Sequence, residues 1–157
     1  MDELLLSIEK SLESKNWYAA LAVALIIPDI CGKIDNPQMN PGGRYPIWYE
    51  KYVNGYLKTH NDIMPKLFTG FDCYAVRCAM LHEFSEDLTS HNARKIIDKY
   101  RFCNPDTCCF GASFKEAGNQ MEINVEEFCE WIRIGVNIWS QESGHSADEI
   151  NNMVKIW

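Results

Sequence analysis

The stretch DCYAVRCAMLHEF, residues 72–84, is a short helix candidate that is apolar on nearly every side yet carries one arginine and one histidine. Apolar residues all around a helix predict that it is buried in a core rather than lying on a surface. Arginine keeps its charge in proteins, so a buried Arg77 must meet a carboxylate, reach a water-filled cleft or bind an anion. Arg77 and His82 are therefore the first candidate functional residues.

The length and composition of the chain predict one globular domain. Its 157 residues suffice for one core and are too few for two ordinary domains. The first residues are acidic, and the longest apolar run, residues 17–27, is too short to span a bilayer. We therefore expect a cytoplasmic protein without a signal peptide or membrane segment. The formal net charge of -7 disfavours a protein that coats long nucleic acid with Lys and Arg.

Four helices are predicted in the first half of the chain from apolar periodicity and capping residues: residues 2–14, 17–34, 46–57 and 72–84. Asn16 caps the second helix, and Pro28 is expected to kink or break it. Residues 35–43 are rich in turn formers and predict a loop, after which Pro46 opens the third helix. Asp72 is expected to cap the fourth.

Tyrosines recur along the predicted third helix. Tyr45, Tyr49, Tyr52 and Tyr56 follow one another at steps of four, three and four, which places them on one helical face. Such a stripe is typical of core packing, and the alternative is a platform on which bases stack.

A β-containing insertion is predicted at about residues 93–123. We expect a small hairpin formed by residues 99–103 and 107–114, with 120–123 as a further short strand. Asn124 then caps a helix over residues 125–141, and a last helix covers residues 147–157. The predicted fold is therefore mainly α with a small β insertion before the last two helices.

Cysteines supply few candidate sites. Cys31, Cys73 and Cys78 lie in apolar helix candidates, where reduced thiols behave as small buried hydrophobes. A second group near His91 offers a zinc site as an alternative, but its spacing C-x4-C-C is not that of a usual zinc finger or ribbon. This group consists of Cys103, Cys108 and Cys109. We expect neither a metal nor a cofactor.

Arg77 and His82 are spelled R-C-A-M-L-H. In this hexad the chain resembles the HEPN superfamily of helical ribonucleases and nucleotide-associated domains, whose signature is an arginine followed after four to six residues by a histidine. The resemblance covers about residues 4–83 in helical layout and the hexad alone in motif. It implies one HEPN-like helical bundle over residues 1–157, with a helical core at about 2–84 and 124–157.

The resemblance also implies an activity. HEPN ribonucleases cleave RNA without a metal and leave a cyclic phosphate, and the motifs of two protomers commonly meet in one cleft. By this resemblance we expect a homodimeric endoribonuclease of toxin or antiphage-defence type, with RNA as substrate and an antitoxin or defence-complex protein as partner. Arg77 and His82 are then the catalytic pair.

The chemistry of that reaction suits these two residue types. Histidine exchanges protons near neutral pH and can take the proton from a ribose 2′-OH. The planar guanidinium of arginine can bind the scissile phosphate through two hydrogen bonds. Residues five apart on an ideal helix are separated by about 140° around the axis, so Arg77 and His82 do not share a face. They converge if the arginine stem bends, if the helix loosens near His82, or if a second subunit supplies the partner, and the resemblance favours the second subunit.

Four other residues are candidates for the site. Asp29 is the lone acid of the neighbouring apolar helix and can hydrogen-bond Arg77 or orient His82, and Tyr74 lies one turn before Arg77. These two are predicted supporting residues. Arg44 and Tyr45 are candidate substrate-binding residues.

A structural role is the competing hypothesis. Asp29 and Arg77 can form a buried, hydrogen-bonded ion pair that fixes helix register, with His82 as a core residue. The chain is then a non-catalytic helical interaction or nucleotide-binding module, or an adaptor in a larger defence assembly.

Overall fold

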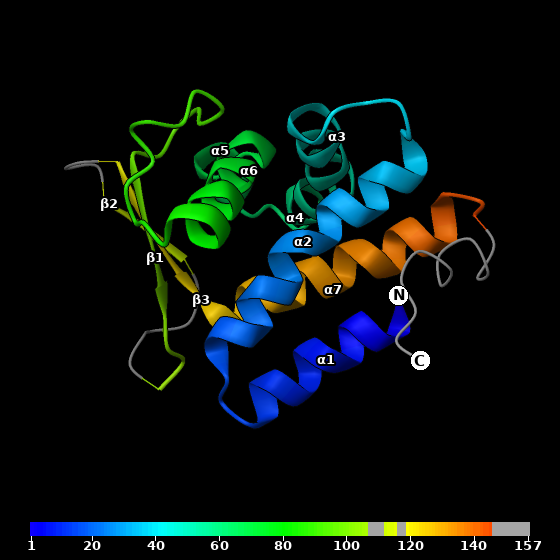
Figure 1. Cartoon of the computed structure of the whole chain (residues 1–157), viewed down its shortest axis with the longest axis horizontal. Helices are drawn as coiled ribbons and strands as arrows, with labels where there is room; N and C mark the ends of the chain where they lie inside the picture. The colour runs from blue at the N-terminus through cyan, green and yellow to red at the C-terminus, as the bar shows by residue number, and fades with distance from the viewer. Residues whose placement is uncertain (107–111, 116–118, 146–157) are drawn as a thin grey trace.

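The computed structural model describes residues 1–106, 112–115 and 119–145. It is mainly α, as predicted, with two long helices at its centre, α2 and α7, and the strands at one end (Figure 1). The elements before the sheet are α1 Asp2–Glu13, α2 Trp17–Asp35, α3 Pro41–Trp48, the π-helix η1 Tyr49–Asn54, α4 Gly55–Thr59, α5 Met64–Leu67, α6 Gly70–Cys78 and the π-helix η2 Ala79–Glu83. They are followed by β1 Lys99–Cys103, β2 Ala112–Lys115, β3 Gln120–Asn124 and α7 Val125–Glu142.

α2 is the central helix of the bundle. The side chain of Asn16 accepts a hydrogen bond from the Ala19 amide at 3.3 Å, which confirms the predicted cap. Of the kink or break predicted at Pro28, the break is wrong, because α2 continues through that residue to Asp35. Proline's fixed φ is compatible with a helix, and packing of α2 against α1, α3, α6 and α7 offsets the hydrogen bond that the missing N–H removes.

Among the described residues, α2 is the one helix long and apolar enough to cross a membrane by length and composition. Its residues Ala20, Ala24, Leu25 and Ile27 are fully buried inside the bundle. Core helices of soluble proteins pass the same test, and the structure is compatible with a soluble protein.

The third helix begins five residues earlier than predicted. Asn40 caps α3 by accepting a hydrogen bond from the Gly43 amide at 2.9 Å, and Pro41, rather than Pro46, occupies the first helical turn. The turn-forming composition of residues 35–43 concealed this cap, because Asn, Pro and Gly also favour helix starts. Pro46 lies inside α3, and η1 and α4 continue the rod to Thr59.

The tyrosine stripe packs into the core. Tyr45, Tyr49 and Tyr52 are buried, and Tyr56 packs against the core from a half-buried position. The ring of Tyr49 meets that of Phe68 edge to face at 6.1 Å between centroids. This confirms the packing prediction for the stripe.

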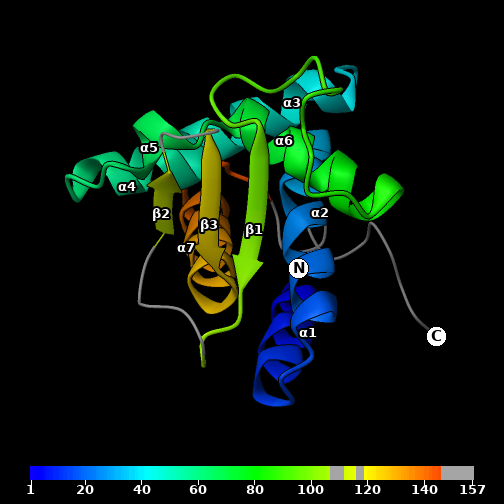
Figure 2. The ribbon, with the colours of Figure 1, turned by 90° about the vertical axis from the view of Figure 1, so that its left-hand side faces the viewer.

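The sheet has the strand order β1-β3-β2 (Figure 2). β1 has the predicted bounds, but the predicted hairpin with the next strand is wrong, because β1 pairs with β3 in parallel and β2 pairs with β3 antiparallel. Met121 and Ile123 of β3 are buried, so β3 occupies the centre, where both of its edges are hydrogen-bonded. Residues 107–111 of the predicted second strand lie outside the described residues.

α7 joins the sheet to the helices. Asn124 caps it, accepting hydrogen bonds from the amides of Glu126 at 2.9 Å and Glu127 at 3.3 Å, as predicted. The ring of Phe128 meets Phe102 of β1 at 5.3 Å. One hydrophobic cluster includes residues from α1 to α7 and from β1 and β3. The predicted last helix, 147–157, lies outside the described residues.

Candidate functional site

The segment that holds the site begins with a capping box. Thr69, not Asp72 as predicted, is the N-cap of α6: its hydroxyl accepts a hydrogen bond from the Asp72 amide at 3.2 Å. The carboxylate of Asp72, three residues into the helix, accepts in return from the Thr69 amide at 3.1 Å and its hydroxyl at 2.6 Å. The two residues thus satisfy each other's polar groups at the start of α6.

Asp72 also anchors the segment that follows the site. Its Oδ1 accepts hydrogen bonds from three consecutive backbone amides, those of Lys95 at 2.6 Å, Ile96 at 2.8 Å and Ile97 at 3.4 Å. The Asp72 side chain is fully buried, and these amides compensate for the burial of its charge. Asp72 therefore fixes the residues leading into β1 against α6.

A π-helical turn brings Arg77 and His82 together. α6 ends at Cys78, and η2 continues the rod as a π-helix over Ala79–Glu83. In a π-helix residues bond at i and i+5, so residues five apart lie one above the other. Arg77 Nη1 and His82 Nε2 are 3.2 Å apart within one chain. Of the three predicted routes, the loosened helix is the one observed, whereas the resemblance favoured the second subunit.

The Arg77–His82 contact fixes the tautomer of the imidazole. A guanidinium nitrogen only donates, so Nε2 of His82 accepts and the ring proton lies on Nδ1. His82 is exposed to solvent, and its helix ends one residue later. The histidine therefore lies at an accessible position, with its Nε2 beside a positive charge.

Asp29 contacts two arginines rather than one. Arg44 Nε donates to Asp29 Oδ1 at 2.7 Å, while Arg77 Nη2 lies 3.7 Å from Asp29 Oδ2. Arg44 is held further by a hydrogen bond from Nη1 to the Met39 carbonyl at 2.8 Å. The predicted Asp29–Arg77 pair is thus the longer of two, and these three side chains carry one positive charge in excess.

Arg77 keeps spare hydrogen-bonding capacity. Its Nε is buried, and within the described part of the chain it has no hydrogen-bond partner. Its Nη1 lies 3.9 Å from the Cys78 sulfur, a weak acceptor. Because Nε is buried, an anion would bind Arg77 through the Nη groups at the end of the guanidinium.

The two tyrosines assigned to the site differ in position. Tyr74 is half-buried, and burial followed by the neighbouring Cys78 thiol raises the pKa of its hydroxyl, which therefore stays protonated and able to donate. Tyr45 is buried to 0% exposure, and its hydroxyl contacts the Cys73 sulfur at 3.3 Å. Its ring supports Tyr74 from behind, with 5.5 Å between centroids. Tyr45 is therefore too buried to contact a substrate, contrary to its assignment as a candidate substrate-binding residue.

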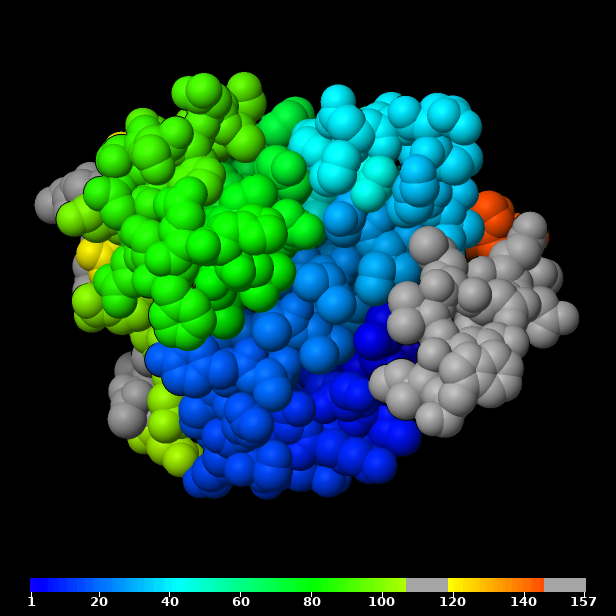
Figure 3. All heavy atoms as spheres, viewed as in Figure 1, coloured from blue at the N-terminus to red at the C-terminus, as the bar shows by residue number. Residues whose placement is uncertain are grey.

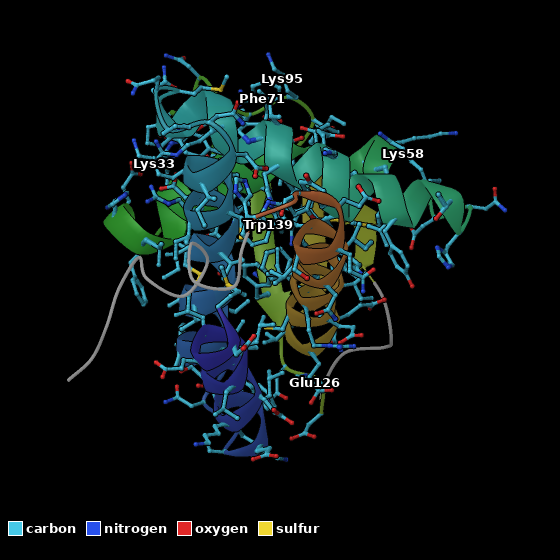
Figure 4. All side chains as sticks on the ribbon, turned by 90° about the vertical axis from the view of Figure 1, so that its right-hand side faces the viewer. Lys33, Lys58, Phe71, Lys95, Glu126 and Trp139 are labelled. Atoms are coloured by element: carbon cyan, nitrogen blue, oxygen red, sulfur yellow. The ribbon has the colours of Figure 1, made fainter. Side chains whose placement is uncertain are left out.

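The segments that carry these residues meet on one face. Figure 3 shows atoms of α2 (blue), α3 (cyan) and residues 70–100 (green) side by side. A hollow of about 870 Å³ lies elsewhere, between α1 and α7. Its lining includes the acidic side chains of Glu9, Glu126 and Glu130. In Figure 4, Glu126 lies at the opposite end of the molecule from Phe71 of α6. The acidic lining makes that hollow unsuitable for a phosphate.

The structure thus unites most of the predicted site residues. Arg77, His82, Asp29 and Arg44 form a chain of contacts, with Tyr74 next to them. Asp72 was predicted as a cap, but its anchoring of residues 95–97 was not, and its only sequence signal was an acid three residues after a threonine. Cys108 and Cys109 lie outside the described residues, and the described ranges contain no group of three or more His, Cys, Asp or Glu that could hold a metal.

Comparisons with protein-family profiles, with curated protein sequences and with solved structures found no match to this chain. The geometry of the Arg77–His82 cluster is therefore the basis for a functional proposal, together with the R-x4-H motif.

Proposed function

We propose that the chain is a metal-independent endoribonuclease that cleaves RNA by attack of a ribose 2′-OH on the adjacent phosphate. The observation that carries the proposal is the 3.2 Å contact between Arg77 and His82, beside a surplus of positive charge. This arrangement suits a negatively charged, phosphate-containing substrate, and the motif matches that of HEPN ribonucleases.

Each residue has a role in that reaction. A phosphate draws the Nη groups of Arg77 toward its oxygens and so frees Nε2 of His82 to take the proton from the 2′-OH. The 2′ oxygen bonds to phosphorus, the bond from phosphorus to the 5′ oxygen breaks, and that oxygen takes a proton from water. The hydroxide that remains takes the proton from His82, which restores the histidine. The products are a 2′,3′-cyclic phosphate and a 5′-OH end. Arg77 stabilises the growing negative charge, and the Tyr74 hydroxyl donates to the same phosphate.

Asp29 positions the two arginines, and Arg44 contacts the substrate. Asp29 links the guanidinium groups of Arg44 and Arg77 and limits their repulsion without neutralising both. Arg44 is a substrate-binding residue in this proposal, because it adds a second guanidinium beside the phosphate.

The biological setting follows from the resemblance. We propose a cytoplasmic enzyme of toxin or antiphage-defence type, with a homodimer as its assembly and an antitoxin or defence protein as a partner. The π-turn already unites Arg77 and His82 in one chain, so a second copy would enlarge the RNA-binding surface rather than complete the catalytic pair.

The test compares RNA cleavage by the purified parent, His82→Ala and His60→Ala in buffer with EDTA. His60 is a matched control, an exposed histidine that contacts Tyr56 and Thr59 away from the site. We expect the parent and His60→Ala to cleave equally and His82→Ala to be slower by roughly 10²–10⁴-fold. Equal rates for His82→Ala and the parent would refute the assignment.

A nucleotide-binding module without catalysis is the second candidate. The observation that favours it is the Arg44–Asp29 contact at 2.7 Å, which holds the guanidinium of Arg44 near that of Arg77. Two neighbouring guanidinium groups suit a phosphate whether or not His82 moves a proton. This candidate predicts nucleotide binding that Arg77→Met abolishes, with RNA left intact by the parent.

A further inference from the structure

Two aromatic rings lie exposed near the site. Tyr18, in the first turn of α2, is 68% exposed, and Phe84, directly after η2, is 80% exposed. The two rings stack with 5.9 Å between centroids and 25° between planes. Aromatic side chains normally contribute by burial, so a stacked pair held in solvent indicates a surface kept for a ligand.

The backbone of Phe84 supports the same conclusion. Phe84 ends η2 in the left-handed conformation, with φ +54° and ψ +40°. This conformation suits glycine at a helix end, and a β-carbon disfavours it. The position thus carries a residue that is unfavourable for the backbone and gains little from burial, a combination found at functional sites.

A pocket lies under the two rings. Its volume is about 180 Å³, several times that of a water molecule. Apolar and aromatic groups form most of its lining: Tyr18, Leu21, Met80, Phe84, Tyr100 and Phe102. Arg101 also lines this pocket. It is largely exposed and forms an ion pair with Glu86 at 3.6 Å. A flat ring with polar edges fits an aromatic pocket that has charged groups at its rim.

The pocket and the Arg77–His82 pair share one helical turn. Met80 of η2 lines the pocket, and Phe84 follows His82 by two residues. Two residues extend the chain by at most about 7.6 Å between Cα atoms, so Phe84 stands next to His82. α2 passes both places, with Tyr18 at its start and Asp29 roughly 16 Å further along its axis. A base in the pocket and a phosphate at Arg77 would therefore belong to one RNA strand.

We propose that the Tyr18–Phe84 pocket binds one unpaired nucleobase of a single-stranded RNA whose cleaved phosphate is held at Arg77. The proposal deepens the proposed ribonuclease function and rests on it for the phosphate position. Stacking accepts any base, so the pocket selects unpaired over paired nucleotides rather than one sequence. This explains how a chain of net charge -7 can bind RNA at one place without a broad basic surface.

The test uses a short single-stranded RNA with one 2-aminopurine, whose fluorescence falls when the base stacks. It is titrated into the His82→Ala protein, which leaves the RNA uncut, and into the same protein carrying Phe84→Gly, Tyr18→Ala or Ile63→Ala. Ile63 is a matched control, an exposed apolar residue between α4 and α5 that is 62% exposed. We expect Phe84→Gly to weaken binding by roughly 5- to 150-fold and to abolish the quenching, because one stacked base contributes about that factor.

Folding is checked separately by thermal melting. Glycine suits the left-handed backbone, so Phe84→Gly is expected to melt at the parent's temperature or above it. Tyr18→Ala should lose binding like Phe84→Gly, and Ile63→Ala should bind like the parent. Binding and quenching that survive Phe84→Gly, or an RNA that His82→Ala does not bind at all, would overturn the proposal. The readout is independent of cleavage: an inactive parent that binds RNA through Phe84 would refute only the ribonuclease function.

Discussion

The two arginines that share Asp29 should differ when each is replaced by methionine. Methionine keeps much of the apolar stem and removes the guanidinium, so each variant isolates the polar contacts. Arg44 makes two short hydrogen bonds, to Asp29 at 2.7 Å and to the Met39 carbonyl at 2.8 Å. Arg77 makes a 3.7 Å ion pair with Asp29, too long for a hydrogen bond, and an exposed contact with His82.

The magnitudes follow from these contacts. Losing charge-assisted hydrogen bonds in Arg44→Met should cost about 1.5–3 kcal/mol of unfolding free energy. In a chain of this length that corresponds to a Tm lower by roughly 3–12 °C. Arg77→Met leaves the Asp29–Arg44 pair in place, so its cost should be about 0–1 kcal/mol and its Tm within ~4 °C of the parent.

The assay combines thermal melting with RNA cleavage in EDTA. Arg77→Met should be close to the parent in stability and nearly inactive, because the guanidinium that binds the phosphate is gone. Arg44→Met should be the less stable of the two. A larger loss of stability for Arg77→Met than for Arg44→Met would refute this reasoning, because it would identify Arg77 as the structural partner of Asp29.

Three further predictions follow from single contacts. Asp72→Asn should lower the unfolding free energy by about 3 kcal/mol, seen as a Tm drop of ~6–12 °C, because an amide cannot accept all of the hydrogen bonds that this buried carboxylate receives. Tyr74→Phe should slow cleavage by about tenfold or more through loss of a donor to the phosphate, while RNA binding to the His82→Ala protein stays within about threefold. Burial raises the pKa of the Cys129 thiol from 9.0 to about 12, so its protonated form stabilises the fold fully below about pH 9 and that contribution falls as pH rises toward 12. Denaturant midpoints from pH 8 to 11 should therefore fall less steeply in Cys129→Ala than in the parent.

Local signals predicted much of the helical fold. Asn16 and Asn124 cap α2 and α7 as their sequence context indicated, because capping depends on a few neighbouring residues. The start of α3 was misplaced because Asn40, Pro41 and Gly43 suit both a loop and a helix start. The strand positions also followed from the local sequence pattern. The pairing of the strands did not, because it depends on β3 packing against residues that are distant in the sequence.

The candidate site was predicted in its members but not in its geometry. The R-x4-H hexad selected Arg77 and His82, yet ideal α-helical spacing separated them, and only a π-turn unites them. Asp29 was correctly placed beside Arg77, whereas its closer partner Arg44 lies 15 residues from it in the sequence, across a loop. Contacts of this kind follow from tertiary packing of α2 against α3, which helical periodicity does not specify.

The products of cleavage test the central claim most directly. An RNA of defined sequence, and the same RNA with a 2′-deoxy sugar at the cleaved nucleotide, would be incubated with the parent in EDTA and the ends identified by mass spectrometry. We predict a 2′,3′-cyclic phosphate and a 5′-OH from the first RNA and no cut at the deoxy position in the second, because the 2′-OH is the nucleophile. Cleavage at the deoxy position, or a 5′-phosphate end, would contradict a reaction started by His82 at the 2′-OH.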